Sequence, residues 1–524
     1  MTSTSTGRHP GKRLSPWRVA IGVLIACALI AGVVVIPWYL FTSRPAVSAP
    51  IGPRWFGAYY DVTAADAADT SASSSASASD GVLLSFVVAA SSDSCQPSWG
   101  GAYSLMDAGR SLDLDRRVEG MRREGAHVAI SFGGAKNTEL GTACSSVNDL
   151  ANAYSTVIDR YSVSTVDLDL ENQNLSDSAA GDRRAQALAK LQASRRADGS
   201  DLTVWLTLPV GLDGFTQDGL RAIRQLLQAG VNLAGVNAMT MDFNVPLSGK
   251  SMADAAIGAL QGAHDQLERL YADQHEALPS DGAWGVLGAT AMIGQNDVRG
   301  EVFTLKDAAK LNDFAQDQRL ARLSMWSANR DRTCGPNYPD LTVVSTSCSG
   351  VDQGDASFAG TLRRGFSGLP GGDATPSASP TASLPDDAET APYPLWTEGA
   401  AYSAGVRVVW HGYVYAAKWW VSGGYQPDDP MPTTDQTAWR LIGPVLPTDV
   451  PFSLPTAPAG TPVWASDQPY DKGAVVSYQG VPYRAKWWTR GDVPSDGITD
   501  HDRSPWAVVE DTAPTTTPSP SAGP

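Results

Sequence analysis

The segment Val166-Asp167-Leu168-Asp169-Leu170-Glu171 alternates apolar side chains with carboxylates. Successive side chains of a β-strand point to opposite faces, so a strand here would place Asp167, Asp169 and Glu171 on one face. Carboxylates that converge inside a closed barrel raise one another's pKa, so one of them can hold a proton near neutral pH and act as a general acid. The alternative is an edge strand with a solvated acidic face. We favour the buried arrangement, because a barrel strand has a packed interior on one side and helices on the other.

The region around this segment, from Arg54 to about Phe366, alternates short apolar runs with amphipathic stretches. The expected strands are Trp55–Tyr60, Val82–Ala89, His127–Phe132, Thr165–Leu170, Leu202–Pro209, Leu233–Met241, Trp284–Met292 and Leu323–Ser327. Helical spacing of apolar residues predicts helices at Leu150–Tyr161, Arg183–Arg196, Asp218–Gln228 and Met252–Leu270. Strands that alternate with helices in this way indicate an α/β fold of the (β/α)8 TIM-barrel type. A doubly wound open sheet is the alternative, but no Gly-rich phosphate turn follows the first strand.

Four motifs fall in order along this region. They are Ser131-Phe132-Gly133-Gly134, the Asp-x-Asp-x-Glu run at 167–171, Met239-Thr240-Met241-Asp242 and Ser324-Met325-Trp326. Together they resemble family 18 glycoside hydrolases, the chitinases, over residues 54 to 366. They would lie at the ends of strands three, four, six and eight, on the rim where TIM barrels carry their active sites. The resemblance implies a chitinase-like hydrolase that cuts chitin or a related N-acetylglucosamine polymer.

The resemblance also assigns catalytic roles. Glu171 matches the residue that protonates the leaving oxygen, and Asp169 the carboxylate that stabilises an oxazolinium ion. Asp167 matches the deeper carboxylate of the run, and Asp242 a residue that positions the acetamido group. The nucleophile would be the N-acetyl carbonyl of the substrate, and cleavage would retain the anomeric configuration. No cofactor is expected, and the few, scattered histidines support neither a metal site nor a His-based triad.

Four further residues are expected to bind substrate. Trp326 matches the aromatic floor beneath the sugar, and Gly133, Gly134 and Met239 belong to the motifs around it. The alternatives are a tight turn for the two glycines and a core position for Trp326. Trp205 and Trp284 lie inside predicted strands, so we expect them in the core.

The sequence departs from the family pattern at two positions. Ser164 stands where the acidic run usually begins with an Asp, early in the strand and away from the rim. Met241 stands where many members carry a Tyr that hydrogen-bonds the acetamido oxygen, and a Met cannot replace that donor. A non-catalytic polysaccharide-binding protein with a degenerate barrel therefore stays an alternative, as does an endo-β-N-acetylglucosaminidase.

Apart from Cys27, which lies in an apolar run, the chain has an even number of cysteines: Cys95, Cys144, Cys334 and Cys348. An even number in an oxidising compartment indicates disulfides, and the sequence alone allows three pairings. We favour Cys95–Cys144 and Cys334–Cys348, because each pair falls in one neighbourhood of the barrel. A zinc site is the alternative, but the spacings match no zinc pattern and no His accompanies them.

Residues 19–41 form an apolar run long enough to cross a bilayer, which needs about 20 residues. The preceding segment 1–18 is basic, so we expect it in the cytoplasm and the run to be a transmembrane signal anchor. A cleaved signal peptide is the alternative, although its apolar stretch is normally shorter and Pro50 disfavours cleavage after Ala49. Either way the rest of the chain faces outside, so a single-pass cell-membrane location is expected.

An internal repeat with an offset of 68 residues follows the barrel. It pairs Tyr402 with Tyr470, Tyr415 with Tyr483, and Ala417-Lys418-Trp419-Trp420 with Ala485-Lys486-Trp487-Trp488. A repeat with matched aromatics indicates a duplicated module. The units resemble the small chitin-binding modules of carbohydrate-binding families 5 and 12. The resemblance implies that Trp419, Trp420, Trp487 and Trp488 are sugar platforms, since aromatic planes stack on the apolar face of a sugar. Tyr415, Tyr483, Trp439 and Trp506 are expected in the cores.

Composition completes the predicted domain order. Segments rich in Pro, Ser, Thr and Ala mark linkers. The order is a basic segment (1–18), an anchor (19–41), a linker (42–53), the barrel (54–370), a linker (371–392), module 1 (393–445), a linker (446–462), module 2 (463–510) and a disordered tail (511–524). The net charge of −16 and the lack of a basic stripe outside the N-terminus exclude nucleic acid as a partner. We expect a monomer whose partners are the polysaccharide and, through one N-terminal helix, the membrane.

Overall fold

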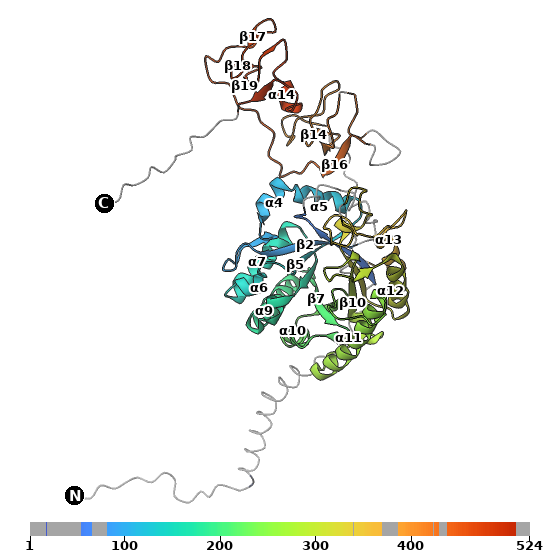
Figure 1. Cartoon of the computed structure of the whole chain (residues 1–524). Coiled ribbons are helices and arrows are strands. Elements are labelled where there is room, and N and C mark those ends of the chain that lie inside the picture. Colours follow the sequence, from blue (N-terminus) through green and yellow to red (C-terminus); the bar gives the residue numbers. More distant parts are fainter. Residues whose placement is uncertain are drawn as a thin grey trace, which may run out of the picture.

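The computed structural model describes Trp17 and residues 54–64, 81–338, 340–368, 386–422, 424–428 and 437–509. Within these residues, eight parallel strands close into a ring, and the last strand pairs with the first (Figure 1). In ring order they are β1 (Trp55–Asp61), β2 (Gly81–Ala89), β5 (His127–Gly133), β6 (Thr165–Asp169), β7 (Thr203–Gly211), β9 (Leu233–Met239), β10 (Leu287–Met292) and β13 (Arg322–Trp326). The predicted TIM barrel is confirmed.

Helices cover the outside of the ring (Figure 1). They are α4 (Leu105–Ser111), α5 (Leu114–Arg123), α6 (Leu140–Ala143), α7 (Val147–Arg160), α8 (Asn172–Ser176), α9 (Ser178–Ala197), α10 (Gln217–Gln228), α11 (Met252–Gln274), α12 (Leu305–Asp317) and α13 (Phe358–Leu362). Hydroxyl side chains fix several of their starts. Ser251 and Thr304 each accept a bond from the backbone of the third helical residue and complete a capping box. All four predicted helices are present.

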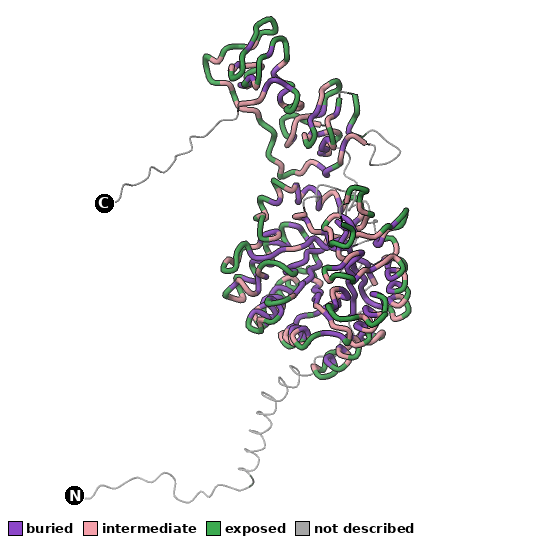
Figure 2. The backbone as a smooth tube through the Cα atoms, in the orientation of Figure 1, coloured by how far each residue is buried: buried purple, intermediate pink, exposed green. Residues whose placement is uncertain are grey.

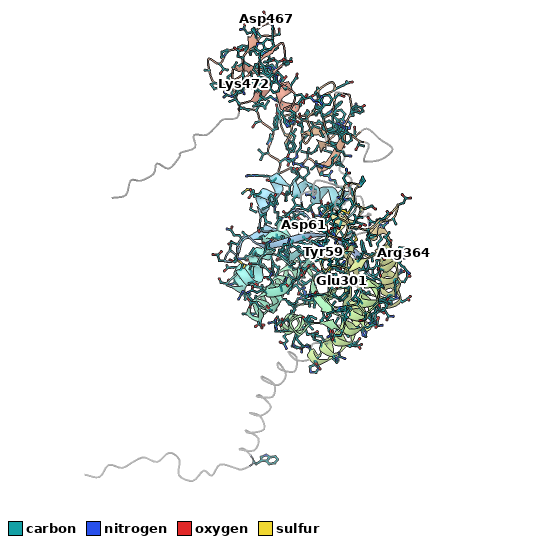
Figure 3. All side chains as sticks on the ribbon, in the orientation of Figure 1. Tyr59, Asp61, Glu301, Arg364, Asp467 and Lys472 are labelled. Carbon is teal, nitrogen blue, oxygen red and sulfur yellow. A yellow bond between two sulfur atoms is a disulfide. The ribbon has the colours of Figure 1, made fainter. Side chains whose placement is uncertain are left out.

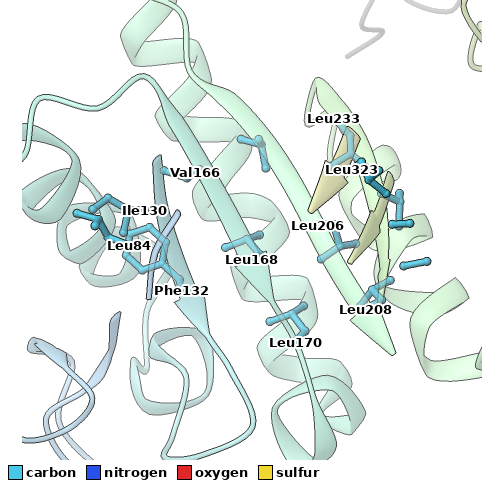
Figure 4. Close-up of a cluster of buried hydrophobic side chains, with 14 of the residues drawn as sticks. Leu84, Ile130, Phe132, Val166, Leu168, Leu170, Leu206, Leu208, Leu233 and Leu323 are labelled. Carbon is cyan, nitrogen blue, oxygen red and sulfur yellow. The ribbon is translucent and has the colours of Figure 1, made fainter. Parts of the chain in front are cut away.

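Successive side chains of each strand point to opposite faces, so the strands form one buried cluster outside the ring and another inside it. Val166, Leu168 and Leu170 are buried on the outer side, beside Leu206 and Leu208 of β7 (Figure 4). Each such buried aliphatic side chain contributes roughly 1.5–3 kcal/mol of transfer free energy. A second cluster of buried residues fills the inside of the ring: Trp55, Tyr59, Leu83, Ala129, Trp205 and Ala321.

Glycines make room for the inner cluster. A Cβ on Gly57 would lie 2.5 Å from the Trp55 ring, and one on Gly235 would lie 2.5 Å from the Trp205 ring. The two indoles meet edge to face with 5.6 Å between ring centroids. The lower part of the ring is therefore a packed core, and the chemistry has to sit above it.

Some strand ends differ from the prediction. β6 ends at Asp169 and β9 at Met239, so Glu171, Met241 and Asp242 lie in the loops that follow. β10 begins only at Leu287, because a 3-10 helix (η2, Gly282–Val286) occupies the start of the predicted strand. The prediction that Trp284 lies in a strand is wrong; it is half-buried and stacks on His264 with 4.3 Å between ring centroids.

Short strands that were not predicted from the sequence lie at the rim of the barrel. They are β3 (Pro97–Trp99), β4 (Tyr103–Ser104), β8 (Gly214–Phe215), β11 (Gly294–Gln295) and β12 (Val302–Phe303). The two predicted disulfides are confirmed, with Cα–Cα distances of 4.5 Å for Cys95–Cys144 and 5.0 Å for Cys334–Cys348. The zinc alternative is therefore wrong.

The repeat folds as two small β modules. Module 1 contains β14 (Arg407–Trp410), β15 (Tyr413–Ala417) and β16 (Trp439–Pro444). Module 2 contains β18 (Val475–Tyr478), β19 (Val481–Ala485) and β21 (Trp506–Val508), with β17 (Pro469–Tyr470), β20 (Thr489–Arg490) and α14 (Asp496–Thr499) beside them. Tyr415, Trp439, Tyr483 and Trp506 are buried in the two cores, as predicted. These cores are small compared with the buried interior of the barrel (Figure 2).

Several predictions lie outside the described residues. They concern the basic segment apart from Trp17, the anchor 19–41, the linker 42–53, most of the linker 371–392 and the tail 511–524. Among the residues that the structure describes, no helix is long and apolar enough to cross a membrane.

Candidate active site

The three carboxylates of the 166–171 segment lie at increasing height in the barrel. Asp167 is 0% exposed and Asp169 is 4% exposed, and Glu171, just beyond the end of β6, is half-buried. The structure therefore brings all three to the inner side of the strand. This arrangement excludes the solvated edge strand that the sequence left open.

Asp167 accepts hydrogen bonds from four side chains on four other strands. Thr207 Oγ1 and Arg322 Nη1 lie 2.6 and 2.7 Å from Oδ1. Ser131 Oγ and the Tyr59 hydroxyl lie 2.8 and 2.9 Å from Oδ2. Each of these bonds has the carboxylate as acceptor, and charge-assisted bonds of this kind are the stronger ones. The network therefore fixes the position of the Asp167 carboxylate at the bottom of the site.

Arg322 supplies the positive charge at the bottom of the site. Its Nη2 donates to Tyr59 at 2.9 Å and its Nε to Ser324 at 2.6 Å. Its guanidinium carbon also lies 4.7 Å from the Trp55 ring centroid and 5.3 Å from that of Trp205. A buried charge is tolerated only when it is paired and hydrogen-bonded, and Arg322 meets both conditions.

Asp169 has a different environment from its neighbour. Its Oδ1 is buried and has no hydrogen-bond partner among the described residues. Burial raises the pKa of the Asp169 carboxyl well above its usual range, and the negative charges of Glu171 and Asp167 raise it further. Asp169 therefore holds a proton more readily than a solvated aspartate does.

Glu171 meets the electrostatic requirement for a general acid. Burial raises the pKa of its carboxyl to about 7, and the negative charges of Asp242 and Asp297 contribute to the shift. An acid with a pKa near the working pH is both protonated and able to give its proton away. Glu171 can therefore hold a proton at neutral pH at the rim of the barrel.

The loop after Glu171 is fixed by the loop of the preceding strand. Asn174 of α8 accepts a bond from the Glu139 backbone at 3.1 Å and donates one to the Asn137 carbonyl at 3.1 Å. The buried Glu139 carboxylate in turn bonds Tyr154 at 2.6 Å and Arg184 at 2.6 Å. These bonds hold the start of α8, and with it the position of Glu171.

Asp242 reaches the site from the loop after β9, where its backbone has a positive φ of 47°. Its Oδ1 accepts a bond from the Val298 backbone at 3.1 Å. The buried Glu301 carboxylate fixes this loop, because it accepts bonds from the backbones of Phe243 and Asn244, each at 3.0 Å. Burial raises the pKa of Asp242, and Asp297 adds to the effect. Glu301 is labelled within the barrel domain in Figure 3.

A buried arginine, Arg330, interacts electrostatically with two of these carboxylates, Asp297 and Asp242. Arg330 follows β13 in a 3-10 helix (η3, Ala328–Arg330) and is 2% exposed. Its Nε and Nη1 have no hydrogen-bond partner among the described residues. Burial lowers the pKa of its guanidinium to about 10, against the opposing charges of Asp297 and Asp242. Two donors are therefore available beside the carboxylates of the rim.

Trp326 lies at the carboxyl end of β13 and remains half-buried. It stacks on Phe86 with 5.3 Å between ring centroids and an interplanar angle of 19°, and Tyr59 meets it edge on at 6.1 Å. The ring therefore contacts the inner cluster on one side and is partly open to solvent. This position fits the aromatic floor that the motif predicts.

The remaining predicted residues divide between backbone and rim. Gly133 has a φ of +106°, and a Cβ there would lie 2.0 Å from the Asp169 carbonyl oxygen; Gly134 donates its N–H to that oxygen at 2.9 Å. The two glycines thus let β5 approach β6 closely, while their contact with substrate stays a prediction. Met239 is half-buried at the end of β9, and Met241 is buried. Ser164 is exposed and precedes β6, away from the carboxylates, as expected.

Several residues of the site were not predicted from the sequence: Tyr59, Phe86, Thr207, Arg322, Asp297, Glu301 and Arg330. Arg322 gave one usable signal, because it is a charged residue directly before the apolar run of the last strand. Asp297 and Glu301 lie in loops whose path the sequence did not predict, and Arg330 lies in a short 3-10 helix that was not predicted either. Among the described residues, no group of three or more His, Cys, Asp or Glu could hold a metal ion.

The predicted sugar platforms of the modules differ in exposure. Trp419, Trp487 and Trp488 are 45%, 44% and 60% exposed. Trp420 is less exposed than these three: it is half-buried, and the side chain of Arg503 lies over its ring. Three of the four rings are therefore open to a ligand, and the fourth is covered within the chain.

Comparison with known proteins agrees with this geometry. Over 315 residues the chain is 30% identical to a probable bifunctional chitinase/lysozyme of Escherichia coli K12, a match that covers 57% of this chain and 34% of the relative. Over 309 residues it is 29% identical to endochitinase 11 of Metarhizium anisopliae, covering 56% of this chain and 57% of the relative. The barrel is chitinase-like. The family 18 resemblance of the four motifs is thereby confirmed.

The chitinase-like region spans about a third of the length of the first relative and just over half of the second. A solved structure, the catalytic domain of a hyperthermophilic chitinase from Pyrococcus furiosus, is similar at 27% identity, with a TM-score of 0.49, over 61% of this chain and 99% of that one. Residues 463–507 match the model of carbohydrate-binding module family 5/12, which confirms the resemblance of module 2.

Proposed function

We propose that the protein is a chitinase that hydrolyses β-1,4 N-acetylglucosamine linkages with retention of configuration. The observation that carries the proposal is the different environment of the three carboxyls on one strand. The Asp167 carboxylate accepts hydrogen bonds from four side chains, whereas burial raises the pKa of Asp169 and of Glu171. Pairs of carboxyls whose environments differ in this way mark the acid and the electrostatic partner in glycosidases.

In the first step, Glu171 transfers its proton to the glycosidic oxygen while the bond from that oxygen to C1 breaks. The acetamido carbonyl oxygen of the substrate forms a bond to C1 from the opposite face and gives an oxazolinium ion. The pKa of Asp169 is raised partly by neighbouring negative charge. A positive charge on the acetamido group offsets that negative charge, and Asp169, which acts as a carboxylate throughout this step, stabilises the ion.

In the second step, the carboxylate of Glu171 removes a proton from water as the water oxygen attacks C1. The bond between C1 and the acetamido oxygen breaks, and the free acetamido group is restored. Two inversions at C1 give net retention. Asp242 orients the acetamido group from the β9 loop, and Trp326 forms the floor below the sugar.

The modules would hold the polymer close to the barrel. Exposed indole rings bind the apolar faces of sugar rings, and the family 5/12 match of module 2 supports a carbohydrate ligand. The two disulfides support an oxidising location, so we place the barrel and modules outside the cell. A monomer anchored in the cell membrane through residues 19–41 completes the proposal.

The test is product analysis on chitin, peptidoglycan and glycoprotein glycans side by side, with the anomeric form of the first products followed by NMR. We expect soluble chito-oligosaccharides from chitin, formed initially as the β-anomer. Release from glycans alone would assign an endo-β-N-acetylglucosaminidase. Binding to chitin without release of any sugar would instead support the non-catalytic alternative.

A further inference from the structure

The two tryptophan pairs of the repeat have unequal surroundings. Trp419 and Trp487 correspond and have nearly equal exposure, 45% and 44%. Trp420 and Trp488 also correspond, yet Trp488 is 60% exposed while Trp420 is half-buried. The difference has one evident cause: the guanidinium carbon of Arg503 lies 3.6 Å from the Trp420 ring centroid. A residue of module 2 therefore covers a predicted platform of module 1.

Hydrogen bonds around Ser403 fix this contact. Ser403 belongs to module 1 and is 0% exposed. Its backbone N–H donates to the Thr499 carbonyl at 2.8 Å, and its hydroxyl donates to Asp500 at 3.0 Å. The Asp502 backbone donates to the same hydroxyl at 3.0 Å. Residues 499–503 of module 2 are thus bonded to module 1 through both backbone and side chain.

The linker 446–462 is also held in place rather than free. Asp449 pairs with Arg116 of the barrel at 2.7 Å. Phe452 donates its N–H to the Ala391 carbonyl beside module 1, and Ala457 donates to the Gly480 carbonyl in module 2, each at 2.7 Å. The two modules lie next to each other, with module 1 against the barrel (Figure 1). A flexible tether would show none of these attachments.

We propose that the two modules form one rigid carbohydrate-binding unit in which Trp420 is an interface residue covered by Arg503. The sugar platforms are then Trp419 of module 1 together with Trp487 and Trp488 of module 2. Guanidinium groups stack on indole faces, so Arg503 occupies the surface that a sugar would otherwise use. The assignment of platforms rests on the proposed binding of chitin, whereas the rigid docking does not.

The binding test compares matched alanine variants of the full chain for retention on insoluble chitin. We expect W488A to weaken retention about tenfold, as for a well-packed aromatic contact. W420A should weaken it less than twofold, because its ring faces Arg503. A loss for W420A equal to that for W488A would overturn the assignment of platforms.

The docking test measures the distance distribution between spin labels on module 1 and module 2. Glu398 and Lys472 are exposed, so labels on E398C and K472C in a Cys27→Ser background should not disturb the interface. We expect a single narrow distribution for the native interface and a broad one for S403A/R503A. The control is R484A, which replaces an exposed arginine of module 2 and should leave the distance distribution narrow.

A broad distribution with the native interface would overturn the rigid unit, even if W420A itself failed to fold. Complete absence of retention by the unmodified protein would contradict the proposed function instead. In that case the label distances still decide the docking, so the two failures are distinguishable.

Discussion

Arg322 donates a hydrogen bond of 2.7 Å from Nη1 to Oδ1 of Asp167, across the inside of the barrel from β13 to β6. Both side chains are buried, with side-chain exposures of 0% for Arg322 and 1% for Asp167. Removing one partner of such a pair leaves an uncompensated buried charge. We therefore expect R322M to lower the free energy of unfolding by about 3–5 kcal/mol.

A double-mutant cycle tests whether the two charges act as a pair. D167N/R322M should lose less stability than the sum of D167N and R322M, with a coupling of roughly 2 kcal/mol measured by urea unfolding. The exposed pair Lys310–Asp254 provides a control, for which a coupling below about 1 kcal/mol is expected. Strictly additive losses for the buried pair would show that Arg322 and Asp167 do not stabilise each other.

The pH dependence of hydrolysis follows from the raised pKa of Glu171. The general acid must be protonated, so kcat/KM on a short soluble oligomer should fall as the pH rises through about 7. Asp297 is exposed and contributes to that pKa. Removing its negative charge in D297N should move the alkaline limb to lower pH by roughly a few tenths of a unit.

The control for this measurement is D313N, which replaces an exposed aspartate on α12. It should leave the profile unchanged. A limb in D297N that shifts to higher pH, or does not move, would mean that Asp297 does not raise the pKa of Glu171.

The disulfides should contribute unequally to stability. Cys95 and Cys144 are separated by 49 positions, and Cys334 and Cys348 by 14. Loop-closure entropy then predicts losses of about 4 kcal/mol for C95A/C144A and about 3 kcal/mol for C334A/C348A. Urea unfolding of the unmodified protein and of each double variant, with and without reductant, measures both losses. Reductant should lower the free energy of unfolding less in a double variant, which has one disulfide fewer to lose. An equal decrease in the unmodified protein and in a double variant would contradict the assignment of the disulfides.

The contact between barrel and module 1 predicts protease sensitivity. Arg116 of α5 bonds Asp449 and, at 2.5 Å, the Pro444 carbonyl. A Cβ on Gly443 would lie 2.5 Å from the Arg116 carbonyl oxygen. G443V and D449A should therefore loosen the contact and speed cleavage within residues 446–462.

The matched control is D467A, which alters an exposed aspartate of module 2 far from the barrel (Figure 3). Its cleavage should equal that of the unmodified protein. The same slow cleavage in all three variants would show that the contact does not protect the linker.

The sequence was sufficient for the ring of strands because each buried strand is a short apolar run with a two-residue period. Val166, Leu168 and Leu170 identify the outer face, and the carboxylates between them identify the inner one. The disulfide pairs were predictable for the same reason, since the order of strands places the cysteines in two neighbourhoods.

The surroundings of the carboxylates were not predictable in the same way. The partners of Asp167 lie 36 to 155 positions away in the chain, and no local pattern records contacts that the closure of the ring creates. Asp297 and Arg330 reach the rim through loops without periodicity. Arg503 covers Trp420 because one module packs against the other. The two modules carry identical motifs, so the sequence repeat gives no sign of this packing.

The most direct test of the central claim is the paired measurement of hydrolysis and retention on colloidal chitin for Glu171→Gln. The substitution keeps the size of the side chain and removes its transferable proton, so release of soluble sugar should fall by about 10² to 10⁴-fold while retention stays unchanged. Release at the native rate, with retention intact, would contradict the assignment of Glu171 as the acid.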